Sequence, residues 1–385
     1  MLQKVTRAKS DGRSTIGFDV AVASVATAVP GEPITQAEIV QRAREYYPQF
    51  AHMESLYANT GIKTRYACEP REWYLSPRTW EERTASFQRH ALDLLERVAV
   101  DAVARAGLKL GEIDAIVTNT ITGLAIPSLD AMLMNRLDFA PHVERLPIFG
   151  LGCGGGVGGL ARATRLAQTM PGGNVLFLTV ELCSLCFRIN DPGVAMFVSG
   201  ALFGDGAAAV VLRNTAGEDG AGGGGRILAL GEHFWRDTEY IMGWDVKNDD
   251  FGIVLSAELP GLMRENLAAA VTAFLDRAGL DLKDFAGFLL HPGGSKVLDV
   301  AEDVLGLSPE DLEPSRSVLR DYGNMSSATA LFVLRHARDS GRSGRHLLMA
   351  FGPGFSAYFA VVDLYAGGHA EPGGAGKACR EARQP

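Results

Sequence analysis

The chain has 385 residues, of which 47% are hydrophobic and 21% charged, a composition typical of a folded protein with an ample core. Its net charge of -8 argues against nucleic acid as the main partner, because binding to a phosphate backbone needs a basic face. No run reaches the roughly 18 uninterrupted apolar residues of a membrane span. The polar start, residues 1–14, lacks the apolar segment of a signal peptide. We therefore expect a cytoplasmic protein without a membrane span.

The first predicted elements are a buried strand over 17–28 and a helix over 36–47, with Thr35 as the N-cap of that helix. A long amphipathic helix is predicted over 81–106 and ends at Gly107, a common C-terminal signal. An apolar run then leads into glycines that bracket Cys153, and a helical pattern follows.

The loop around Cys153 admits three interpretations. A thiol between a strand end and a helix start can be a nucleophile, because unpaired N–H groups and the helix dipole favour the thiolate. Gly150, Gly152 and Gly155 also satisfy the G-x-G-x-x-G dinucleotide pattern, with Glu181 as the candidate for the acid expected roughly 20 residues further on. The third interpretation is tight helix packing around a buried structural cysteine. The loop alone leaves all three open.

An internal repeat bears on this choice. Segment 105–117 is echoed by segment 277–289, and each copy predicts a helix end, a short loop and a buried strand. The second copy lacks the glycines of the first, which disfavours the dinucleotide interpretation. We expect two halves, 1–226 with the nucleophilic cysteine and 227–385 with the histidine and asparagine named below. A glycine-rich segment joins them, and about 366–385 is expected to be a disordered tail.

Polar side chains follow buried strands at three junctions, at Cys153, His291 and Asn324. Ligands gather where strands end and helices begin in layered folds. A cysteine can accept an acyl group, and histidine and asparagine can stabilise the enolate formed when a malonyl thioester loses CO2. The three residues therefore indicate acyl-thioester chemistry. Other histidines, including His336 and His346, are interpreted as surface residues.

The motifs around these junctions resemble those of type III polyketide synthases, the chalcone and stilbene synthase family. They are the Cys153 loop and the segments 201–208 (ALFGDGAA), 291–294 (HPGG), 323–328 (GNMSSA) and 351–355 (FGPGF). The resemblance implies an α/β thiolase-like fold, a duplicated five-layered α-β-α-β-α arrangement. It also implies an acyltransferase with Cys153 as nucleophile, and with His291 and Asn324 as the pair that supports decarboxylation.

The resemblance further implies which residues shape the substrate cavity, although ordinary core packing remains the alternative for each. Phe203 would stand between the CoA tunnel and the cavity, Ile126 would reach across a homodimer interface, and Asp205 is interpreted as a turn residue. The remaining expected lining residues are Thr122, Cys186, Trp244, Ile253, Ser326, Gly352, Pro353 and Gly354.

The C-x-x-C pair of Cys183 and Cys186 can indicate zinc or redox chemistry. A structural zinc site needs four ligands and the sequence has no second pair, so we expect no metal. The five cysteines, odd in number and widely spaced, indicate reduced thiols. No cofactor is expected beyond the CoA thioester substrates.

Segments 123–130 and 242–246 are more similar to those of bacterial alkylpyrone and alkylresorcinol synthases than to those of plant chalcone synthases. This similarity implies an aliphatic, long acyl-CoA starter that is extended by malonyl-CoA and cyclised to a pyrone or a resorcinol. Segment 49–61 has no lysine or arginine where the family often binds CoA phosphates, so Lys63, Arg65 and Arg71 are candidate substitutes. Delivery of the starter by an acyl carrier protein is the alternative.

Two rival functions stay open. A β-ketoacyl carrier protein synthase III would use the same fold and residues for a single condensation. A non-catalytic acyl-binding or thiol-sensing protein would keep the fold and use the Cys183 pair.

Overall fold

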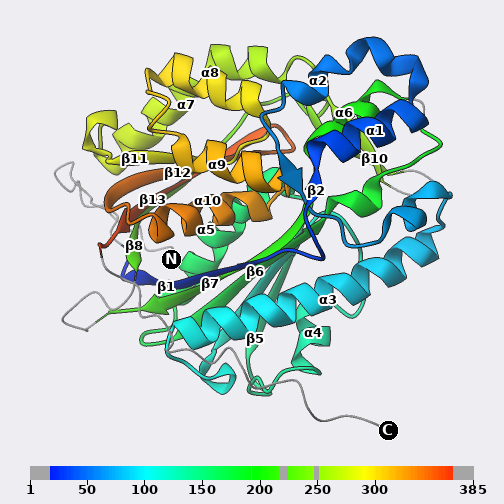
Figure 1. Ribbon diagram of the computed structural model, residues 1–385. Coiled ribbons are helices and arrows are strands. Elements are labelled where there is room, and N and C mark those ends of the chain that lie inside the picture. The colour runs from blue at the N-terminus through cyan, green and yellow to red at the C-terminus, as the bar shows by residue number, and fades with distance from the viewer. Residues whose placement is uncertain (1–17, 192, 217–223, 247–250, 367–385) are drawn as a thin grey trace, which may run out of the picture.

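Nine strands form one mixed sheet within residues 18–191, 193–216, 224–246 and 251–366, the part of the chain that the computed structural model describes (Figure 1). The tail expected from 366 onward lies outside the described residues except for its first residue. The strands in spatial order are β11 (Gly287–Leu290), β12 (Gly344–Gly352), β13 (Ser356–Leu364), β8 (Gly225–Phe234), β1 (Val20–Ala28), β7 (Asp205–Asn214), β6 (Asn174–Leu182), β4 (Ala115–Thr120) and β5 (Glu144–Phe149).

The sheet repeats one pattern of pairing on either side of the contact between β1 and β8. On one side, β1 is antiparallel to β7, β7 is antiparallel to β6, and β6 is parallel to β4. On the other side, β8 is antiparallel to β13, β13 is antiparallel to β12, and β12 is parallel to β11. Strands β1 and β8 themselves share one registered pair, Ala21 with Arg226. The predicted duplication is therefore present in the topology.

Helices cover both faces of each half of the sheet, because side chains alternate between the two faces of a strand. On β6, Leu176 and Leu178 pack with α3, whereas Val175 and Phe177 point into the core between the two halves. Helices α5 and α10 fill that central core, and α7 and α8 cover the outer face of the second half. Their bounds are α3 (Trp80–Arg105), α5 (Gly155–Gln168), α7 (Leu259–Ala278), α8 (Ser295–Leu305) and α10 (Ala328–Asp339). The predicted α-β-α-β-α layering is confirmed (Figure 1).

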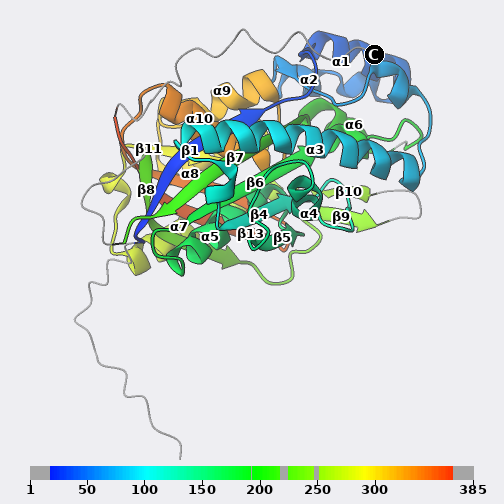
Figure 2. The ribbon, with the colours of Figure 1, turned by 90° about the horizontal axis from the view of Figure 1, so that it is seen from below.

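The helix boundaries follow capping signals. Helix α1 (Gln36–Tyr46) begins after Thr35 in a capping box with Glu38, as the sequence predicts. A second capping box at Thr79 starts α3, and Gly107, with φ of 70°, follows its end. Figure 2 shows α3 crossing strands β1, β7 and β6.

The remaining elements are shorter. They are β2 (Ile34–Thr35), η1 (Pro48–Met53), α2 (Ser55–Ala58), β3 (Thr64–Arg65), η2 (Arg71–Leu75), η3 (Leu110–Glu112), α4 (Leu129–Met134), η4 (Gly152–Gly154), η5 (Cys183–Cys186), α6 (Val194–Leu202), β9 (Met242–Val246), β10 (Phe251–Leu255), η6 (Leu282–Asp284) and α9 (Glu313–Tyr322). Within the described residues, no helix is both long and apolar enough to cross a membrane.

The glycines after Cys153 allow α5 and α10 to meet closely in the central layer. A Cβ atom on Gly156 would lie well under 3.0 Å from the carbonyl oxygen of Ser327, and one on Gly155 would overlap the side chain of Asn119. Gly156 is therefore needed for the contact between α5 and α10, and Gly155 for the contact between α5 and β4. That packing in turn places the start of α5, with Cys153, beside the start of α10, with Asn324.

Candidate active site

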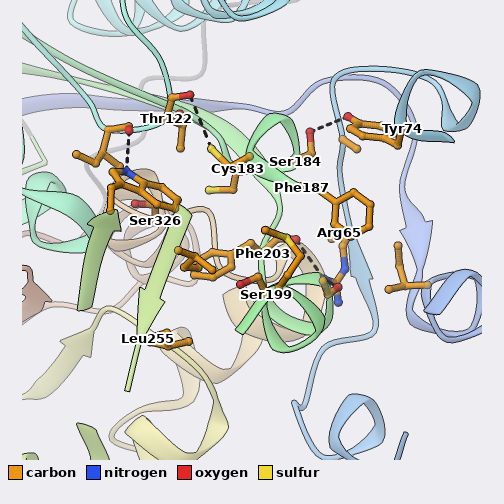
Figure 3. Close-up of a pocket in the computed structure, with 18 of the residues that line it drawn as sticks. Arg65, Tyr74, Thr122, Cys183, Ser184, Phe187, Ser199, Phe203, Leu255 and Ser326 are labelled. Carbon is orange, nitrogen blue, oxygen red and sulfur yellow. Dashed lines mark hydrogen bonds between the residues drawn. The ribbon is translucent and has the colours of Figure 1, made fainter. Parts of the chain in front are cut away.

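A large open pocket runs between the Cys153 turn, η5, α6, α1 and the β9–β10 hairpin, with about 1380 Å³ of empty space when the solvent at its mouth is counted. Most of its wall is apolar or aromatic. Figure 3 shows Thr122, Cys183, Phe203 and Ser326 around it. Such a cavity can hold an extended acyl chain next to a reactive thiol.

Cys153 lies on η4, directly before α5, and its side chain lines the cavity. Burial raises the pKa of its thiol to about 12, although hydrogen bonds with the side chains of Ser326 and Asn324 act in the opposite direction. Burial thus opposes the thiolate that was expected at this helix start, because desolvation disfavours the charged form of the thiol.

His291 follows β11 and is 2% exposed. Its backbone N–H donates to the Met349 carbonyl on β12 at 2.8 Å, which anchors the residue at the end of the parallel pair. Neither ring nitrogen has a hydrogen-bond partner among the described residues. Burial lowers the pKa of the imidazole to about 3, so the ring is neutral at physiological pH.

Asn324 connects these groups. Its Nδ2 donates to the Gly293 carbonyl at 3.2 Å, and its Oδ1 accepts from the Ser326 N–H at 2.8 Å. A Cβ atom on Gly293 would lie 3.9 Å from His291 Nε2, so His291 and Asn324 meet at the same peptide. Ser326, whose N–H donates to Asn324, lines the cavity together with Cys153, so the structure brings the three distant junctions into one region.

Two family models match the chain, the N-terminal domain of chalcone and stilbene synthases over residues 7–216 and their C-terminal domain over residues 229–363. The chain belongs to the chalcone and stilbene synthase family. As a type III polyketide synthase, it is an acyltransferase that catalyses decarboxylative Claisen condensation. This confirms the family inferred from the motifs around the three junctions.

Several proteins are similar to this synthase over nearly their whole length. The 1,3,6,8-tetrahydroxynaphthalene synthase of Streptomyces peucetius subsp. caesius is 37% identical over 91% of this chain and 94% of its own. The phloroglucinol synthase of Pseudomonas fluorescens is 31% identical over 86% of this chain and 95% of its own. The crystal structure of the Streptomyces coelicolor tetrahydroxynaphthalene synthase, a bacterial type III polyketide synthase, superposes with a TM-score of 0.85 at 32% identity and covers 90% of this chain and 99% of the other.

The other predicted site residues take different places in the synthase. Seven of them line the cavity: Thr122, Cys186, Phe203, Trp244, Ile253, Ser326 and Pro353. Gly352 lies against the backbone of Leu151 and Gly154, and its lack of a side chain leaves room for the Cys153 turn. Gly354 has a φ of 131°, a conformation open to glycine. Ile126 is 97% exposed, away from the cavity.

The site region contains two buried carboxylates whose environments the sequence analysis did not predict. Asp205 is not a turn residue: it begins β7, is fully buried, and its pKa is raised to about 6 by burial. Glu181, considered above only as a dinucleotide acid, is also fully buried and accepts hydrogen bonds from Thr122 and Ser327. The available signal was an acidic residue within an apolar strand for Glu181 and at the start of one for Asp205.

Arg65 is unavailable for CoA phosphates. The side chain is 3% exposed, and its guanidinium donates to the carbonyls of Gly200 and Ala201 at 2.9 and 2.7 Å and to Gln36. Arg71 lines the cavity mouth and pairs with Glu45 at 2.7 Å. Of the candidate cations, Arg65 therefore has a structural role.

Two further sequence interpretations can be compared with the structure. Cys183 and Cys186 are both buried on η5 and line the cavity, and no group of three or more potential metal ligands occurs among the described residues. His346 is 1% exposed, which contradicts its interpretation as a surface residue. It begins the buried part of β12, and its Nδ1 lies 2.8 Å from the Gly344 carbonyl.

Proposed function

We propose that the synthase loads an acyl-CoA starter on Cys153, extends it with malonyl-CoA and cyclises the product to an alkylpyrone or alkylresorcinol. The observation that carries this proposal is the Cys153 thiol in the wall of a large, mainly apolar cavity, close to Asn324 and grouped with a buried neutral histidine. An apolar cavity suits the hydrocarbon part of an aliphatic starter.

In the loading step, the Cys153 sulfur attacks the starter carbonyl while its proton passes to a base. We assign this role to His291, because neither nitrogen of its ring has a hydrogen-bond partner among the described residues, which leaves one open to receive the proton. The bond between the carbonyl carbon and the CoA sulfur then breaks, and the CoA thiolate recovers a proton as it leaves. The products are an acyl-Cys153 thioester and free CoA.

In the extension step, malonyl-CoA loses CO2 and the electrons of the broken C–C bond form an enolate. We propose that His291 and Asn324 donate hydrogen bonds to the enolate oxygen, which lowers the barrier to decarboxylation. The enolate carbon attacks the acyl-Cys153 carbonyl, and the bond from that carbonyl to Cys153 breaks. The chain thus grows by two carbons and Cys153 is released for the next round.

The products for which similar proteins are named suggest a second candidate function. Relatives that are 31–37% identical are named for tetrahydroxynaphthalene and phloroglucinol, which are polyhydroxylated aromatic products. An enzyme of that kind would fold its chain into an aromatic ring without a long alkyl tail. The product of this synthase therefore has to be measured.

The test is incubation of the purified synthase with malonyl-CoA and acyl-CoA starters from short to long chain, with products identified by mass spectrometry. We expect alkylpyrones or alkylresorcinols from an aliphatic starter. A polyhydroxylated aromatic product from malonyl-CoA alone would support the second candidate, and a β-ketoacyl product from one extension would favour the carrier protein synthase III. Repeating the assay with starters on an acyl carrier protein identifies the delivery route.

Cys153→Ala removes the nucleophile of this scheme. We expect it to lose both product formation and covalent acylation, as measured by intact-protein mass spectrometry, while its melting temperature stays close to that of the unmodified protein. Undiminished activity would remove Cys153 from the mechanism and favour a non-catalytic role for the junction.

We also propose that the synthase is a homodimer in the cytoplasm, where its CoA thioester substrates are made. Ile126 is 97% exposed, and Phe149 on the edge strand β5 is 50% exposed. Exposed large apolar side chains, one of them on an edge strand, favour burial against a second copy.

A further inference from the structure

The carboxylate of Asp205 has no part in the proposed reaction, yet it is fully buried behind the cavity wall. Burying a carboxylate is costly unless donors surround it. Three donors do so here: the Ser184 N–H and the Cys68 N–H at 2.8 Å each, and the Ser184 hydroxyl at 2.6 Å. Asp205 therefore joins β7 to η5 and to the segment that precedes η2.

The hydrogen-bond chain continues from Ser184 to Tyr74, whose hydroxyl lies 2.7 Å from the Ser184 oxygen (Figure 3). Because the single Ser184 hydrogen goes to the acceptor Asp205, the Tyr74 hydroxyl must donate to Ser184. The Tyr74 oxygen accepts in turn from the Glu69 N–H at 3.2 Å. The hydroxyl of Tyr74 is therefore committed within the wall.

Both Tyr74 and Ser184 line the cavity. In Figure 3 they lie on the side opposite Ser326, with Cys183 between them. Tyr74 thus belongs to a different part of the wall from Ser326. With its hydroxyl engaged by Ser184, it offers the ring and not a polar group to an occupant of the cavity.

We propose that Asp205 and Ser184 are positioning residues that hold Tyr74 as a fixed, hydrocarbon-like wall, and that this wall sets which starter lengths load on Cys153. The starter group facing Tyr74 is a hydrocarbon tail without a hydrogen-bonding end. This inference rests on the proposed loading of acyl-CoA starters. If the Tyr74 ring is fixed, the cavity excludes acyl tails that fit only when the ring moves. Without the hydrogen bond to Ser184, the ring can move and admit those tails.

Loading can be measured alone, by intact-protein mass spectrometry with a series of straight-chain acyl-CoA starters and no malonyl-CoA. Tyr74→Phe keeps the ring but removes its hydrogen bond to Ser184. We expect it to reduce the ratio of the loading rate of the best starter to that of the next longer starter. The expected change is about fivefold, which corresponds to the loss of one hydrogen bond of ordinary strength. Ser184→Ala should have the same effect.

The double variant Ser184→Ala/Tyr74→Phe separates this inference from independent structural effects. Because both substitutions remove the same bond, the double variant should match either single variant and not the product of their effects. Tyr240→Phe is the matched control, since Tyr240 is 54% exposed and its hydroxyl meets Glu258 at 3.2 Å on the surface. Its loading profile should stay unchanged.

Unchanged length profiles in both single variants, at unchanged melting temperature, would overturn this inference and leave the proposed function intact. Multiplying effects in the double variant would also overturn it. If no acyl-CoA loads on the unmodified synthase, the starter step of the proposed function fails together with the inference. Normal loading without polyketide formation on addition of malonyl-CoA contradicts only the proposed function.

Discussion

Glu181 is a fully buried acid in β6, two residues before η5. Its environment makes its contribution to stability depend on pH. It accepts from the Ile121 N–H at 3.1 Å, from the Thr122 hydroxyl at 3.0 Å and from the Ser327 hydroxyl. Burial nevertheless raises its pKa from 4.5 to about 7, because desolvation outweighs these hydrogen bonds. Ionisation of Glu181 in the folded protein is therefore unfavourable relative to the unfolded chain.

This raised pKa predicts that the stabilising contribution of Glu181 is lost as pH rises from about 5 to about 7, while the lowered pKa of His291 acts in the opposite direction. The folded state binds the Glu181 proton more tightly than the unfolded chain, so its contribution is complete below the unfolded pKa of 4.5 and is lost as pH passes the folded pKa of about 7. The loss is of the order of 3 kcal/mol. Urea unfolding of the unmodified protein and of Glu181→Gln across this range measures it, because the stability of the unmodified protein should fall relative to that of the variant as pH rises.

The Glu181→Gln variant should keep part of the dependence of stability on pH. The reason is Asp205, whose pKa is also raised, to about 6. Glu258→Gln, at an exposed position, is the control and should retain the full slope. Equal slopes for Glu181→Gln and the unmodified protein would show that Glu181 ionises as readily in the fold as outside it.

At the scale of elements, the contact between α5 and α10 places the Cys153 junction beside the Asn324 junction. The two helices approach closely because Gly156 has no side chain against the Ser327 carbonyl. Ser327 also bonds Glu181 and Asn119, so a shift of α10 would disturb the polar groups behind the cavity. Helix packing and site geometry thus depend on the same glycine.

Gly156→Ala should destabilise the synthase by several kcal/mol and reduce its activity, since a backbone oxygen cannot move aside as a flexible side chain can. Gly261→Ala is the matched control, because Gly261 lies in α7 and nothing stands within 4 Å of the position of its added Cβ. In that variant the better helix propensity of alanine should stabilise the protein by up to about 1 kcal/mol. Thermal unfolding compares the two, and equal stabilities would refute the packing role of Gly156.

At the scale of the whole molecule, two copies of one strand-and-helix unit share a central layer, and the cavity lies where segments from both copies meet. Phe203, which ends the first copy's α6, forms a parallel bridge with Asn324 of the second. The site is therefore composite. Ile126 is exposed in the single chain, and the proposed homodimer would bury it against a second chain.

Ile126→Asp should weaken the proposed homodimer, because a charge in place of an exposed isoleucine would have to be desolvated at the interface. Light scattering after size exclusion should show a shift from twice the chain mass toward the chain mass. Val100→Asp, an exposed apolar position on α3, is the control and should leave the mass unchanged. A monomeric unmodified protein, or a variant dimer as stable as the original, would contradict the assignment of Ile126.

The sequence by itself determined the repeated unit, the capped helices and the three junction residues, because these depend on signals read within a few residues, such as the Thr35 cap and the alternation of buried strands. Only the tertiary structure decided the environment of each polar group. Arg65, Asp205 and His346 look exposed along the chain, yet segments far away in the sequence bury them. Cys153 likewise has a raised thiol pKa, since desolvation depends on what packs around a group and not on its neighbours in the chain.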